Sequence, residues 1–162
     1  MDYQEYKLEK HVWTDADFDR MIWHDNSIHG FAPMDETYEC AFDIDYITQW
    51  VQLPDERRLS FWVAPATFVF ENVRLIDVSF LSESGYINID NIKKSDQVYA
   101  PDGEHFDWLW TINLHQGEIS LRATGYKLYV RSKPILSQLQ RLTLSQRGNV
   151  SFHKSVPDNE SL

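Results

Sequence analysis

The sequence predicts a mainly β protein, folded as an antiparallel sandwich or barrel with one or two short helices. Three observations support this fold class: apolar and polar residues alternate in several segments, polar turns separate these segments, and aromatic residues make up 14% of the 162 residues. Alternation with a period of two places every second side chain on one face, as in a half-buried strand. Aromatic side chains also favour strands. Many short strands separated by turns indicate antiparallel sheets rather than βαβ units.

A β-hairpin is predicted from two alternating segments in the second half of the chain. Apolar residues alternate with polar ones over residues 108–114 and again over residues 118–124, and Gly117 lies in the short turn between them. Glycine suits a tight turn because it tolerates positive φ angles. Residues 127–131 are expected to continue the second strand of this hairpin.

Residues 61–70 are apolar on both faces, which predicts a central strand that is covered on both sides. Pro65 interrupts this run and is expected at a bulge or bend, because proline lacks the N–H group that a ladder needs. Residues 75–81, 86–92 and 150–153 are further strand candidates.

Two short helices complete the prediction. Thr14 precedes Asp15 and Asp17, and this pattern favours a helix over residues 15–21 because the hydroxyl caps the first turn and acids suit its positive end. Apolar residues at helical spacing over residues 135–144 predict a second helix.

Residues 1–154 are expected to form a single globular domain, and residues 155–162 a frayed tail. The amino terminus lacks the features of a secretory signal, and no apolar run approaches the roughly 20 residues that span a bilayer. We therefore expect a cytoplasmic protein. The single cysteine, Cys40, excludes an intramolecular disulfide and is interpreted as a buried thiol.

The formal net charge is −10. Proteins that bind nucleic acid or anionic membranes usually carry a basic face, so neither is expected as a partner. An acidic surface instead favours encounter with a basic protein partner.

Two polar clusters are candidate metal ligands. His24 and His29 lie in the segment Trp23-His24-Asp25-Asn26-Ser27-Ile28-His29-Gly30, and Asp43 and Asp45 share one face of an alternating strand. Imidazole nitrogens and carboxylate oxygens are ligands for divalent metals. The four residues would meet if the first segment formed a hairpin with the strand that carries Asp43. The alternative is an ordinary turn at His24–His29 and a solvated strand face at Asp43 and Asp45.

Three segments carry a family resemblance: Phe61-Trp62-Val63-Ala64-Pro65-Ala66-Thr67-Phe68-Val69-Phe70-Glu71-Asn72-Val73, Trp23-His24-Asp25-Asn26, and Gly117-Glu118-Ile119-Ser120-Leu121-Arg122-Ala123-Thr124-Gly125-Tyr126. Together they resemble an uncharacterised family of small bacterial proteins, over residues 20 to 152. The resemblance implies a bacterial source. It implies no catalytic residue, because that family has no assigned activity.

Three functions remain open. The first is a protein-binding module, for example of the immunity type, which should show exposed aromatic residues rimmed by carboxylates. The second is a small metal-dependent enzyme that uses His24, His29, Asp43 and Asp45. The third is a small-ligand carrier with an aromatic-lined interior, formed by Trp62, Phe70, Trp108 and Trp110. The sequence does not decide among them, and it specifies neither an enzyme nor an oligomeric state.

Overall fold

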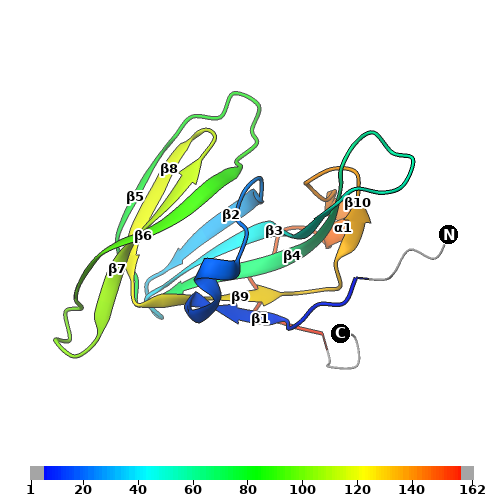
Figure 1. Ribbon diagram of the computed structural model, residues 1–162. Coiled ribbons are helices and arrows are strands. Elements are labelled where there is room, and N and C mark those ends of the chain that lie inside the picture. Colours follow the sequence, from blue (N-terminus) through cyan, green and yellow to red (C-terminus); the bar gives the residue numbers. More distant parts are fainter. Residues whose placement is uncertain (1–5, 158–162) are drawn as a thin grey trace.

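Two antiparallel sheets form the protein, as seen in a computed structural model that describes residues 6–157 (Figure 1). The first sheet has the strand order β1 (Val12–Thr14), β9 (Gly125–Val130), β4 (Ser60–Glu71), β3 (Glu39–Val51) and β2 (Ser27–Met34), and β10 (Ile135–Ser137) also pairs with β4. The second sheet has the order β5 (Arg74–Phe80), β8 (Gly117–Ala123), β7 (Phe106–Leu114) and β6 (Ile89–Tyr99). This confirms the predicted mainly β, antiparallel, sandwich-like fold. Among residues 6–157, no helix is long and apolar enough to cross a membrane.

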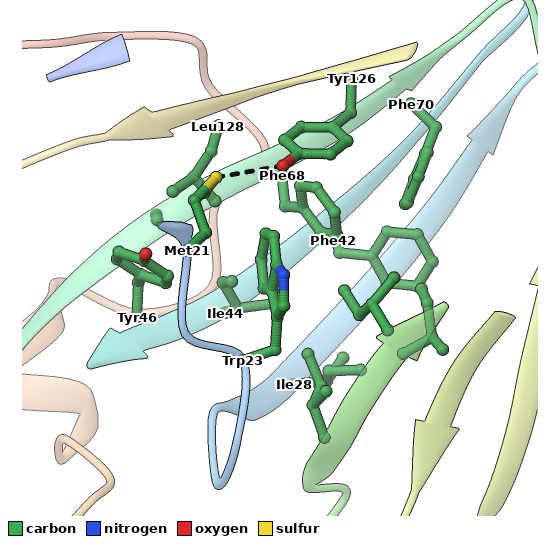
Figure 2. Close-up of a cluster of buried hydrophobic side chains, with 14 of the residues drawn as sticks. Met21, Trp23, Ile28, Phe42, Ile44, Tyr46, Phe68, Phe70, Tyr126 and Leu128 are labelled. Carbon is green, nitrogen blue, oxygen red and sulfur yellow. Dashed lines mark hydrogen bonds between the residues drawn. The ribbon is translucent and has the colours of Figure 1, made fainter. Parts of the chain in front are cut away.

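An aromatic-rich core joins the two sheets. Its largest completely buried side chains include Phe42, Phe68 and Phe70 from the first sheet and Trp110 from the second. Figure 2 shows Trp23 and Met21, from the segment before β2, packed over the inner face of the first sheet. The ring centroids of Phe70 and Trp110 lie 5.6 Å apart. Both residues were expected to line the interior of a ligand carrier, and in the structure they pack against each other.

β4 is covered on both faces, as its apolar sequence predicts, because residues 61–70 are almost all buried. The expected bulge at Pro65 is wrong: the β3–β4 register runs through this residue without a shift. The carbonyl of Pro65 accepts a hydrogen bond from the Arg131 N–H. Because the N and C=O of one strand residue point to the same side, the proline nitrogen also faces away from β3. On that side β9 pairs with residues 66–71 and β10 with residues 61–63 of β4. The missing N–H of Pro65 therefore lies between these two paired stretches, where no ladder hydrogen bond is lost.

The predicted hairpin is confirmed as β7 and β8. A Cβ on Gly117 would overlap the Ser79 carbonyl oxygen of β5, so the glycine also allows the neighbouring strand to approach. The expected continuation of β8 through residues 127–131 is wrong. The chain leaves the second sheet at Thr124 and enters the first as β9, where Tyr126, Leu128 and Val130 complete the core.

The first helix is confirmed in place, as the 3₁₀ helix η1 (Asp15–Arg20) with Thr14 and Asp17 forming a capping box. The helix expected over residues 135–144 is wrong. Residues 135–137 instead pair with the open edge of β4, and α1 (Leu144–Arg147) begins only after the Thr143 cap. Residues 150–153 form no strand. Within the expected tail of residues 155–162, residues 158–162 lie outside the described residues.

Candidate metal centre

The structure divides the four residues singled out by the sequence between two places. β2 and β3 pair as the expected hairpin, and the register shifts between Ile28 and Gly30, so His29 is the extra residue of a bulge. His29 Nε2 lies 2.7 Å from Asp45 Oδ2. His29, Asp43 and Asp45 therefore come together on the outer face of the first sheet, whereas His24 makes its contacts elsewhere.

Two arginines occupy the carboxylates of Asp43 and Asp45. The Arg147 guanidinium donates to both Asp43 oxygens at 2.7 Å and to Asp45 Oδ1 at 3.0 Å. Arg131 donates to Asp43 Oδ1 at 2.9 Å. An arginine therefore pairs with each of the two acids, and no oxygen of Asp43 lacks a donor.

The expected solvated face at Asp43 and Asp45 is wrong, because both side chains are completely buried. Residues 139–153, called the C-terminal segment from here on, cover them. The N–H groups of Leu142 and Ser151 in this segment donate to Asp45 and Asp43, respectively. Burial by itself would raise the pKa of Asp43. The donors Arg147, Ser151 and Arg131 outweigh burial, and the pKa lies below its ordinary value. This cluster attaches the C-terminal segment to the sheet.

His24 lies in a second cluster, which faces solvent. Its neighbours are Asp25 in the same turn, Asp90 in β6 and His115 in the turn between β7 and β8. The ligand atoms of His24, Asp90 and His115 all lie within 4.8 Å of one another. Three segments that are distant in sequence thus place two imidazoles and a carboxylate around one point.

The distance between His24 and Asp90 suits two ligands of one metal ion, and His24 Nδ1 also lies within hydrogen-bond range of the Asp90 carbonyl oxygen, at 3.3 Å. His24 Nδ1 is 3.3 Å from Asp90 Oδ1, and His24 Nε2 is 3.3 Å from Asp25 Oδ2. Charge-assisted hydrogen bonds are usually shorter, at about 2.7–2.9 Å. Two ligands that each lie about 2.0–2.1 Å from a tetrahedral zinc ion are separated by roughly 3.3 Å. The pair His24 and Asp90 already has this separation.

Backbone pairing between the sheets positions the cluster. The Asp25 N–H donates to the Ile89 carbonyl at 2.8 Å, and the His115 N–H donates to the Asn88 carbonyl at 2.9 Å. The β6–β7 register shifts between Ile89 and Asn91, so Asp90 lies at an irregularity of the ladder. Bulges of this kind re-aim a side chain.

Neighbouring side chains hold Asp25 and the His24 ring. His115 Nε2 donates to Asp25 Oδ1 at 3.0 Å, and Gln140 donates to Asp25 Oδ2 at 2.7 Å. The His24 ring stacks on Trp50, with centroids 6.0 Å apart. A carboxylate that accepts from a metal-binding imidazole fixes the orientation of that ring, which is the position Asp25 occupies.

Sequence reasoning found His24 and missed Asp90 and His115. His115 stands beside the glycine of a hairpin turn, where a polar residue needs no special explanation. Asp90 stands in a strand candidate whose bulge leaves no sequence signal. No spacing rule connects residues 24, 90 and 115, because the register between two sheets brings them together.

Comparison with known protein families, with curated proteins and with solved structures finds no significant match to this chain.

Proposed function

We propose that this protein binds a divalent transition-metal ion of the zinc class through His24, Asp90 and His115. One observation carries the proposal, namely the convergence of their ligand atoms to within 4.8 Å. Nitrogen and carboxylate ligands suit zinc and its neighbours in the first transition row. Asp25 accepts a hydrogen bond from His115 and orients the ligands around the ion.

Three protein ligands leave a tetrahedral ion with one position for water or for a group from another molecule. The side chains of His24, Asp90 and His115 are all exposed, so this position would open to solvent. A metal-bound water loses its proton far more readily than bulk water does. The proposed site thus belongs to the class of the metal-dependent enzyme expected from the sequence, with a different set of ligands.

Calorimetric titration of chelator-treated protein with zinc chloride tests this proposal. The wild type should bind one equivalent, and His115→Ala and Asp90→Asn should each weaken binding at least tenfold, because each removes one of three ligands. His105→Ala is the control, since His105 is an exposed histidine outside the cluster and its side chain pairs with Asp102. Absence of stoichiometric binding, or equal binding by His115→Ala, overturns the proposal.

Tryptophan fluorescence provides a second measurement. Cu²⁺ quenches nearby indoles, and the His24 ring stacks on Trp50. Addition of Cu²⁺ should therefore quench the wild type more strongly than Trp50→Phe at the same metal occupancy. Equal quenching of both proteins would place the ion away from His24.

A specific observation also favours the protein-binding module as a second candidate. Tyr99 and Phe106 stack with ring centroids 4.6 Å apart, yet Tyr99 is 63% and Phe106 41% exposed. The turn between them carries the exposed acids Asp102 and Glu104. Exposed aromatic residues beside carboxylates match the surface expected for a basic protein partner.

The double variant Tyr99→Ser/Phe106→Ser tests this second candidate. Purified basic proteins captured by the wild type should lose affinity for the double variant and retain it for Tyr86→Ser, a control at an exposed tyrosine that lines a different pocket. Binding should also weaken with salt, because charge steers the encounter. Equal affinity of the double variant and the wild type argues against this surface.

A further inference from the structure

A pocket lies between the C-terminal segment and the start of β2. It is open, has a volume of about 290 Å³, and is lined by His29, Tyr86, Arg141, Thr143 and three leucines. This size is near the lower end for small-molecule pockets. None of the three proposed metal ligands lines it, so a ligand can bind in this pocket whether or not the metal site is occupied.

Arg141 supplies an uncommitted cation at this pocket. Its guanidinium lies 4.2 Å above the centroid of the Tyr86 ring. No hydrogen bond or ion pair joins Arg141 to any other part of residues 6–157, although the chain contains 25 acidic residues. This contact with the ring uses none of the guanidinium N–H groups as hydrogen-bond donors to the described chain. A guanidinium can donate two parallel N–H hydrogen bonds to the two oxygens of a carboxylate.

His29 supplies an oriented acceptor on another wall. Its Nε2 lies 2.7 Å from the buried Asp45 carboxylate, whose second oxygen accepts from Arg147. A carboxylate partner places the imidazole hydrogen on Nε2, so Nδ1 presents a lone pair. Nδ1 has no hydrogen-bond partner within the part of the chain that the structure describes, and His29 lines the pocket.

The remaining lining combines apolar side chains with one hydroxyl. Leu139 and Leu144 are more than half exposed at the pocket and give it an accessible apolar surface. No acidic side chain lines the pocket, although the chain carries a net charge of −10. The pocket thus offers a cation for a carboxylate, an acceptor for a hydroxyl and an apolar surface.

We propose that this pocket binds a small monocarboxylate that carries a hydroxyl group and an apolar body. The carboxylate pairs with Arg141, the hydroxyl donates to His29 Nδ1, and the apolar body packs on Leu139 and Leu144. The buried Asp45 is a positioning residue, because it acts only through the His29 ring.

Titration of ¹⁵N-labelled protein with mandelate, followed by NMR, tests this proposal. Mandelate should shift the backbone amides of residues 139–144 and the His29 ring resonances. Methyl mandelate, which lacks the charge, and phenylacetate, which lacks the hydroxyl, should each bind at least tenfold more weakly. Equal binding of methyl mandelate overturns the role of Arg141, and equal binding of phenylacetate overturns that of His29.

Arg141→Gln should also weaken mandelate binding at least tenfold without loss of folding, because Arg141 is exposed. Arg20→Gln is the matched control, since Arg20 is an exposed arginine and neither it nor its partners Glu9 and Asp17 line the pocket. Absence of shifts in residues 139–144 at saturating mandelate overturns the proposal, as does equal affinity of Arg141→Gln and the wild type.

Discussion

Replacement of Arg147 by methionine should lower the free energy of unfolding by about 3–5 kcal/mol, the usual cost of removing one partner from a buried ion pair. The Arg147 side chain and the carboxylates of Asp43 and Asp45 are completely buried. A methionine side chain fills similar space but donates no hydrogen bond to either carboxylate. Asp43 would retain Arg131 and a backbone N–H, whereas Asp45 would lose its only arginine.

Urea unfolding measures this effect. With a slope of about 2 kcal/mol per molar urea for a domain of this size, the midpoint should fall by roughly 1.5–2.5 M. Arg20→Met is the matched control, because the Arg20 side chain is 51% exposed and pairs with the exposed Glu9 and the mostly buried Asp17. Exposed ion pairs contribute little, so this control should move the midpoint far less. Equal shifts in the two variants would refute the assignment of a buried structural cluster.

The pH dependence provides a further check on Arg147→Met. In the wild type the pKa of Asp43 lies below its ordinary value, so its contribution is complete above pH 4 and is lost at lower pH. Without Arg147 the burial that raises this pKa has less opposition, and protonation relieves the buried charge. The stability difference between variant and wild type should therefore be largest at neutral pH and should narrow as the pH falls below about 4.

Three other predictions concern single sites. Gly117→Ala should destabilise the protein and speed amide exchange in β5, because the new Cβ overlaps the Ser79 carbonyl; unchanged melting and exchange would contradict this. Cys40 is completely buried and burial raises its pKa to about 12, so iodoacetamide at pH 8 should label it only in urea. A hydrogen bond from Lys10 lowers the pKa of Asp17 to about 2, so the wild type should lose stability between about pH 4 and pH 2, and Asp17→Asn should lose less over that range.

Local patterns predicted the hairpin of β7 and β8, the doubly covered strand β4 and the Thr14 cap. Each depends on neighbours within a few residues, where alternation or capping chemistry decides the outcome. The helix expected over residues 135–144 failed for a non-local reason. Its apolar residues also suit the open edge of β4, and pairing with that edge satisfies backbone groups.

The same distinction explains which site residues could be found. His29 and Asp45 are 16 positions apart, and the predicted hairpin was enough to bring them together. Arg147 reaches Asp43 across 104 positions, and His115 reaches Asp25 across 90. The metal site expected at His24, His29, Asp43 and Asp45 stays a prediction, although His24 lies apart from the other three and arginines occupy both Asp43 oxygens.

The sequence by itself determined that this chain forms antiparallel sheets, because the alternation of apolar and polar residues decides which side chains of each strand are buried. It also determined an acidic protein with one buried thiol. Only the tertiary structure decided that Asp43 and Asp45 are buried with Arg147, and that His24 faces Asp90 and His115. The physical reason is that these contacts depend on the register between sheets and on the path of the C-terminal segment, which arise from the packing of the whole chain.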